Sequence, residues 1–196
     1  TLCYKYDLVG RVWKERPPLP KEKAFLLEEK YAGESVQSKL CRVRERMGAE
    51  RADVHLLSSL DDIAWLLNLR GNDIAYCPLF LSYLLVFEDH AELFADEKKF
   101  LDDVLKELEK NHILLKPYNN IYDTVHVLDA SIRIMLDPDR VNYTLFQSIP
   151  QGASVLECEN PEILMKSVKN DTEISNIKEA HLKDAVAHTK FMYWLK

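Results

Sequence analysis

The sequence has few cysteines and few glycines, and both shortages exclude classes of site. Its four cysteines, Cys3, Cys41, Cys77 and Cys158, are scattered through 196 residues without a closely spaced pair. Structural zinc sites use ligands in such pairs, and disulfide frameworks are typical of shorter secreted chains. We therefore expect reduced thiols in a cytoplasmic protein. Five glycines also leave little room for a glycine-rich phosphate-binding loop.

Excess positive charge and long apolar runs are lacking as well. The net charge is −6, whereas nucleic acids and anionic membranes are bound by basic surfaces. The longest strongly apolar run, Leu79–Phe87, is far shorter than the roughly 20 residues that span a bilayer. The N-terminus lacks the basic and apolar regions of a secretory signal. We expect neither nucleic acid nor membrane as a partner, and the start at Thr1 rather than Met favours a processed product or a fragment.

The most informative stretch that is present runs from Ser59 to Tyr83. Ser59 is expected to cap a helix, with the carboxylate of Asp62 reaching back to the cap. The helix then carries an apolar stripe of Leu60, Ile63, Leu66 and Leu67. Gly71, within the polar turn Arg70–Asp73, is expected to take the positive φ that ends the helix. A loop marked by Pro78 leads into a buried strand.

The rest of the chain alternates between helical and strand patterns. A helix is expected from Ser35 through Met47, with Gly48 just past its end, and another over Phe100–Lys110, with Asn111 in the left-handed conformation at its end. The second helix should turn Phe100, Leu101, Val104, Leu105 and Leu108 inward. Shorter helices are expected over Leu8–Trp13, around Ile121–Leu128 and around Val141–Phe146. The strands are expected at Asp53–Ser58, Leu81–Phe87, Ala91–Ala95, Ile113–Lys116, Ile132–Leu136 and Ser154–Cys158. This pattern predicts an α/β fold with a mixed six-stranded sheet, helices on both faces and one antiparallel hairpin.

A long C-terminal helix follows the sheet. Asn170 and Glu173 are spaced as a capping pair. One face of the helix then carries Ile174, Ile177, His181, Ala185, His188, Phe191 and Leu195. This face covers roughly six turns at 3.6 residues each. A face of this length must be buried against something, and nothing in the chain follows it.

Candidate catalytic and metal-ligating groups are sparse. The acidic pairs Asp61-Asp62, Asp102-Asp103 and Glu28-Glu29 are adjacent in sequence, so their side chains diverge by about 100° on a helix and seldom share a ligand. His181 and His188 are two turns apart, too far to chelate one ion, and are expected to be packed at an interface. His55 is expected to be a satisfied core or edge residue. No serine nucleophile motif is present, and no histidine is tied to Cys77. We predict no catalytic and no metal-binding residue in the chain.

Several segments resemble one family in the right order. Leu60–Ile74 reads LDDIAWLLNLRGNDI, which resembles a signature of the middle domain of three-domain Xaa-Pro aminopeptidases, in the creatinase/peptidase M24 superfamily. Further resemblances occur at Arg16–Pro20, Tyr31–Ser35, Asp137–Tyr143, Lys169–Ile174 and Ala180–Ala187. The resemblance implies an interdomain linker at residues 1–30, a creatinase N-terminal-like middle domain at 31–166, and the first helix of a catalytic domain at 167–196.

The resemblance also implies a function for the parent protein. Such enzymes are metallopeptidases that remove the N-terminal residue from peptides with proline second, using two metal ions, usually manganese. Their metal ligands lie in the catalytic domain, so both ions would bind outside this chain. The fragment itself is expected to be inactive, to orient the catalytic domain, to support a homodimer and to narrow substrate access. The alternative is a stand-alone creatinase-like binding or regulatory module without catalytic activity.

Two interpretations of Arg70, Asn72 and Asp73 stay open. In the plainer one, they form a loop whose arginine pairs with a nearby carboxylate. In the other, which follows from the resemblance, the loop approaches the active site of the neighbouring subunit in a dimer. There, a fixed guanidinium could bind a carboxylate or carbonyl of the substrate.

Overall fold

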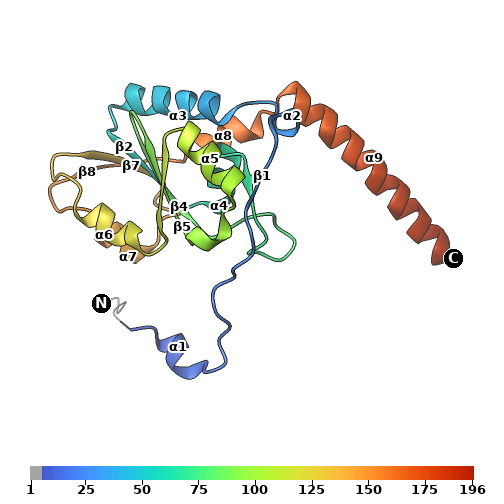
Figure 1. Ribbon diagram of the computed structural model, residues 1–196, viewed down its shortest axis with the longest axis horizontal. Helices are drawn as coiled ribbons and strands as arrows, with labels where there is room; N and C mark the ends of the chain where they lie inside the picture. The colour runs from blue at the N-terminus through green and yellow to red at the C-terminus, as the bar shows by residue number, and fades with distance from the viewer. Residues whose placement is uncertain (1–5) are drawn as a thin grey trace.

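The computed structural model describes residues 6–196 and is built around a six-stranded sheet in the order β6-β5-β4-β2-β7-β8 (Figure 1). Strand β4 pairs antiparallel with both β2 and β5, while the other three pairings are parallel. The predicted mixed six-stranded sheet with its single hairpin is therefore confirmed. The strands are β2 (Val54–Leu57), β4 (Tyr83–Phe87), β5 (Ala91–Ala95), β6 (Ile113–Pro117), β7 (Arg133–Leu136) and β8 (Ser154–Glu157).

Helices cover both faces of this sheet, as the sequence predicts. Successive side chains of a strand point to opposite faces, so Leu57 joins one apolar cluster while Val54 and Leu56 join the other. The first cluster is covered by α3 (Val36–Glu50), α4 (Leu60–Leu66) and α5 (Asp102–Lys110). The second lies beneath α6 (Asn120–His126) and α7 (Tyr143–Gln147). The two groups of helices lie on opposite sides of the sheet in Figure 1.

The N-terminal segment reaches the domain along an extended, proline-containing path. Helix α1 (Leu8–Val12) has no buried residue, which places it outside the core. From Ala24, which is buried, the chain packs on the domain. Strand β1 (Phe25–Leu26) pairs antiparallel with β3 (Leu69–Arg70), and α2 (Glu29–Ala32) follows.

Two helix ends differ from the sequence-based expectation. Helix α3 is capped by Ser35 as predicted, but it continues through Gly48 and ends at Arg51, which takes the left-handed conformation with φ 55°. Helix α5 ends at Lys110 as predicted, but the left-handed residue that follows it is His112, φ 55°, and not Asn111. Asparagine and histidine are both enriched in the left-handed region, so the residue types alone do not select between the two. Helix α5 starts after a 3-10 turn, η1 (Glu97–Lys99), and Leu101 and Leu105 are exposed, contrary to the prediction.

The end of α4 is also set by tertiary contacts. Asn68, not Gly71, has the positive φ, at 49°. Its side-chain oxygen accepts a hydrogen bond from the buried Lys39 ammonium at 2.7 Å, and its amide nitrogen donates to the Glu34 carbonyl at 2.9 Å. Gly71 is needed for a different reason, because a Cβ at this position would lie 2.7 Å from the Cβ of Phe80.

The last two helices leave the body of the domain. Helix α8 (Pro161–Ser167) lies against α4, and α9 (Asp171–Trp194) projects away from the sheet (Figure 1). The predicted capping box of Asn170 and Glu173 is confirmed. No side chain of α9 is buried within this chain, and His181 and His188 are exposed. Their packing at an interface stays a prediction. Within residues 6–196, no helix combines the length and apolar character needed to cross a membrane.

Candidate functional site

The loop that follows β3 is a rigid, closed turn. The Gly71 amide donates to the Pro78 carbonyl at 3.2 Å, and the Asp73 amide donates to the Leu79 carbonyl at 3.0 Å. Ile74 and Cys77 form an additional isolated bridge. These bonds hold the two sides of the loop together, so its tip is presented to solvent in a defined conformation.

Arg70 points back toward α4 and not into the loop. Its Nη1 atom donates to the carbonyl oxygens of Ala64 at 2.7 Å and Leu69 at 2.8 Å. Burial lowers the pKa of the Arg70 guanidinium, and the charge of Glu173 opposes this shift. The guanidinium thus satisfies the Ala64 carbonyl in the last turn of α4, where a cation is also favoured by the helix dipole, and the Leu69 carbonyl of β3.

Asp73 anchors the loop through a buried ion pair. Its side chain and that of Lys99 are both almost fully buried, with Nζ–O distances of 2.5 and 2.6 Å. The same carboxylate accepts a hydrogen bond from the Leu81 amide at 2.7 Å, and Lys99 also donates to the Pro20 carbonyl at 2.8 Å. These contacts join the loop, η1 and the N-terminal segment. Only Asn72, of the three predicted loop residues, has an exposed side chain.

Tyr76 is a feature of this loop that sequence reasoning missed. It lies at the tip, fully exposed, with φ 64°. A bulky residue in the left-handed region is strained, and the isolated bridge between Ile74 and Cys77 holds it there. Pro78 signals a loop in the sequence, but no local motif signals a positive φ at a tyrosine.

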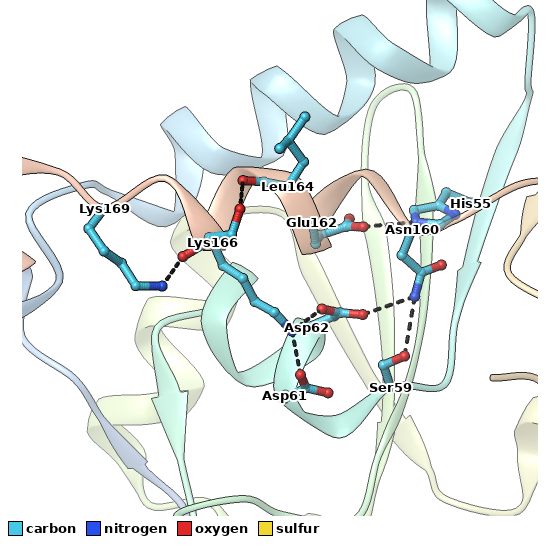
Figure 2. Close-up of polar contacts among 10 residues, drawn as sticks. His55, Ser59, Asp61, Asp62, Asn160, Glu162, Leu164, Lys166 and Lys169 are labelled. Atoms are coloured by element: carbon cyan, nitrogen blue, oxygen red, sulfur yellow. Dashed lines mark hydrogen bonds and ion pairs between the residues drawn. The ribbon is translucent and has the colours of Figure 1, made fainter. Parts of the chain in front are cut away.

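A buried polar cluster joins α4 to α8 (Figure 2). The Asn160 amide donates to Asp62 at 2.9 Å and to the Ser59 hydroxyl at 3.2 Å. Lys166 donates to the other Asp62 oxygen at 2.5 Å and also pairs with Asp61. Asp62 therefore does not complete a capping box with Ser59 as predicted, because its carboxylate is used for contacts with α8, about a hundred residues later in the chain.

His55 and Glu162 form a second part of this cluster, and both side chains are completely buried. The Nε2 atom of His55 lies 3.2 Å from a Glu162 oxygen, and Nδ1 lies 3.1 Å from the Met135 carbonyl. Burial lowers the pKa of His55, but the charge and hydrogen bond of Glu162 and the Met135 carbonyl outweigh it, so the pKa is raised. The prediction that His55 is a satisfied core residue is confirmed.

A hollow of about 490 Å³ opens where the parallel strands β5 and β6 end. Its walls include Pro20, Ala95, Lys99 and Tyr118. The ammonium of Lys99 is already paired with Asp73, so the other charged side chains at the hollow are those of Asp96, Glu97 and Lys98.

Metal-binding chemistry is not provided by the described part of the chain. Among residues 6–196, no three histidine, cysteine, aspartate or glutamate side chains gather closely enough to hold an ion. Cys41, Cys77 and Cys158 are free thiols in the same range, and Cys3 lies outside the described residues. The cluster around Asp62 is charged, but a lysine occupies the position that a cation would take.

Comparison with known proteins connects this fold to one family. The family model of the creatinase/prolidase N-terminal domain matches residues 15–173. Xaa-Pro aminopeptidase 1 of Dictyostelium discoideum is 40% identical over 184 residues, which are 93% of this chain and 29% of that protein. Xaa-Pro aminopeptidase 2 of Sus scrofa is 35% identical over 97% of this chain and 30% of its own length. The chain thus spans about 30% of the length of such relatives.

A solved structure agrees over nearly the whole chain. The X-prolyl aminopeptidase of Caenorhabditis elegans, described as a cytosolic enzyme with a di-nuclear active site, superposes with a TM-score of 0.90 at 29% identity, covering 97% of this chain and 32% of that one. Together with the family model, which matches well over half of the residues, these findings show that the chain belongs to the creatinase/prolidase N-terminal domain family.

Proposed function

We propose that this chain is the non-catalytic middle domain of a metal-dependent Xaa-Pro aminopeptidase. The main support is the superposition with the C. elegans X-prolyl aminopeptidase, which extends over 97% of the chain at a TM-score of 0.90. The parent would be a hydrolase that removes the N-terminal residue from peptides with proline in second position. Its catalytic domain would follow α9, and the enzyme would be cytoplasmic like that neighbour.

The metal ions would be held by the remainder of the parent protein. The described residues of this chain do not fit a metal ion, since no three ligand side chains gather in them. We propose two manganese ions in the parent, in keeping with the di-nuclear site named for the C. elegans enzyme. The role of this domain is then to orient the catalytic domain and to support a homodimer.

The reaction itself provides the first test. The full-length protein, stripped of metal and reloaded with Mn²⁺, should release the first residue from a peptide with proline second and spare the same peptide with alanine second. Absence of release in every metal-loaded preparation would contradict the proposal. It would favour the stand-alone binding module, whose natural reading frame would stop close to Lys196.

We further propose that the loop Arg70–Leu79 narrows access to the active site of a neighbouring subunit. The support is its construction: Arg70 and Asp73 are committed to contacts within the domain, while Asn72 and Tyr76 are exposed on a rigid loop. Rigid aromatic side chains are enriched among residues that dominate interfaces. Asn72 and Tyr76 would therefore meet substrate or partner, and Arg70 and Asp73 would hold them in position.

The variant N72A/Y76A in the full-length enzyme tests this role. We expect kcat/KM for Xaa-Pro peptides to fall about tenfold, which corresponds to about 1.4 kcal/mol, with unchanged thermal stability. Val127→Ala, at an exposed apolar position outside the loop, is the matched control and should leave kcat/KM unchanged. If N72A/Y76A and the unsubstituted enzyme had equal kcat/KM, the loop would not narrow access to the active site. Arg70→Ala is a poorer test, since it also removes the bonds to Ala64 and Leu69.

A further inference from the structure

Helix α8 is attached to the domain mainly by polar side chains. Glu162 is its only fully buried residue, at 0% exposure, whereas Leu164 is 68% exposed. Ile163 and Met165 are only partly buried. Glutamate is almost never fully buried unless it is paired. The attachment of α8 therefore depends on the partner of this carboxylate, together with the bonds of Asn160 and Lys166 to Asp62, more than on apolar packing.

The partner is His55, and both of its ring nitrogens face acceptors. Nε2 lies 3.2 Å from Glu162 Oε2, and Nδ1 lies 3.1 Å from the carbonyl oxygen of Met135. Figure 2 shows the His55 ring on β2 next to the Glu162 side chain of α8. A neutral imidazole carries a single N–H, whereas the imidazolium carries two. Only the protonated ring donates to both oxygens.

The surroundings of His55 favour its charged form. Glu162 faces it from α8, and Asp62 contributes a second negative charge from α4, although Lys166 neutralises part of it. Strand β7 offers the Met135 carbonyl, and β4 places the apolar Val86 opposite His55. Burial alone would lower the pKa of the ring, but these groups keep it above the ordinary value of 6.5.

Loss of the His55 proton would weaken the attachment of α8, leaving the bonds of Asn160 and Lys166 to Asp62 to hold it. One ring nitrogen would then present a lone pair to an oxygen, and the Glu162 carboxylate would be buried without a cation. Its Oε1 atom already has no hydrogen-bond partner within the described residues. An uncompensated buried charge is strongly unfavourable, and the carboxylate would be solvated if α8 moved away from the sheet.

We propose that His55 and Glu162 form a proton-dependent clamp that holds α8 against the sheet and opens when His55 is deprotonated. Only residues 168–170 separate α8 from α9, so the clamp governs the mobility of the α8–α9 junction. The first turn of α9 is tied separately to α2, where the Asn170 amide donates to the Ala32 carbonyl at 2.8 Å. Opening therefore loosens α8 while the start of α9 stays in place.

The pH dependence follows from the raised pKa of His55. The unfolded chain titrates near 6.5 and the folded chain above it, so the clamp is complete below the unfolded pKa and weakens as pH rises through the folded pKa. This trend concerns the chain itself and does not depend on the proposed peptidase function.

Amide hydrogen exchange of the 196-residue chain tests the clamp. The Val168 amide, which donates to the Leu164 carbonyl at 3.2 Å, reports on α8, and the Leu67 amide, which donates to the Ile63 carbonyl at 3.0 Å, reports on α4. After correction for intrinsic exchange, we expect protection at Val168 to fall relative to Leu67 as the pH is raised from about 6 to about 9, the range through which a histidine with a raised pKa loses its proton.

Two variants make the test specific. H55L/E162M replaces the pair by apolar side chains of similar volume, which proteins tolerate well, and should abolish the pH dependence at Val168. His112→Gln, at an exposed histidine, should retain it. Constant relative protection across this pH range in the natural chain, or an unchanged fall in H55L/E162M, would overturn the proposal. Should H55L/E162M not fold, ¹⁵N NMR of the His55 ring decides: a ring already neutral at about pH 6 excludes the clamp, and a doubly protonated ring that titrates together with Val168 exchange supports it.

Discussion

At the scale of single residues, the buried pair Asp73–Lys99 fixes the loop more firmly than any contact that sequence reasoning suggested. We expect Asp73→Asn to destabilise the chain by about 3–5 kcal/mol, because it leaves the Lys99 ammonium buried without a counter-charge. Urea denaturation followed by circular dichroism measures this loss. The asparagine amide carries no negative charge, and it keeps only one of the two oxygens that accept from Lys99.

An exposed ion pair serves as the comparison for Asp73. Lys183 and Glu179 are one turn apart on α9 and both are exposed, so Lys183→Ala should leave the urea midpoint unchanged. A D73N midpoint equal to that of K183A would show that Asp73 is not an anchor. In that case Asp73 would be free to contact a partner, as the sequence-based hypothesis allowed.

The same residue scale shows where sequence reasoning stops. Asn72 and Asp73 lie in the loop that a glycine and a proline mark, whereas Arg70 ends strand β3. Their individual roles could not be derived, since the partner of Asp73 is 26 residues away and no local rule selects Lys99 among the lysines. His55 and Glu162 are 107 residues apart, so their pairing depends on the order of strands in the sheet.

At the scale of secondary-structure elements, patterns within a few residues predicted most strands and helices. They did not predict features that depend on contacts between distant parts of the chain. The hairpin strand Ala91–Ala95 has the predicted bounds, because apolar runs and a polar turn mark both ends. The capping box at Asn170 was also predicted correctly, whereas the one at Ser59 was not, because the Asp62 carboxylate bonds to Asn160 and Lys166. The C-terminus of α5 at Lys110 was predicted correctly, whereas the ends of α3 and α4 were not, because Arg51 and Asn68 adopt the positive φ in place of the expected glycines.

Two glycines at the element scale give opposite predictions for the same substitution. Gly48 lies inside α3, and no atom of a neighbouring residue lies within 4 Å of the position that a Cβ would occupy there. Gly48→Ala should therefore stabilise the chain by about 0.5–1 kcal/mol. Gly71→Ala should destabilise it by about 1–3 kcal/mol, because the new Cβ would meet Phe80 at 2.7 Å and the Leu79 carbonyl oxygen at 3.2 Å.

Thermal unfolding of the two glycine variants checks this pair. We expect G48A to melt at a higher temperature than the unsubstituted chain and G71A to melt at a lower one. If G71A were as stable as the unsubstituted chain, Phe80 would have to move easily to make room for the new Cβ. Close packing at Gly71 would then not be what keeps the loop rigid.

At the scale of the whole molecule, α9 is a long helix without a buried side chain. It is 24 residues long, about 36 Å at 1.5 Å per residue, and leaves large apolar side chains exposed along its length. These are Ile174, Ile177, Leu182, Val186, Phe191, Met192, Tyr193, Trp194 and, just past its end, Leu195. A helix with large apolar side chains exposed on several sides is typical of a surface that another part of a protein covers. The surface agrees with the proposal that α9 packs against a catalytic domain in the parent protein.

The isolated chain should therefore self-associate through α9. We expect sedimentation velocity at micromolar concentration to show dimers or larger species, and L182E/F191E to shift the chain toward monomer, because buried carboxylates without partners oppose apolar contact. The control L114E places the same charge at an exposed apolar position on the edge strand β6 and should leave association unchanged. If the unsubstituted 196-residue chain were monomeric at these concentrations, the result would favour the stand-alone module, since the apolar side chains of α9 would then be stable in water without a partner.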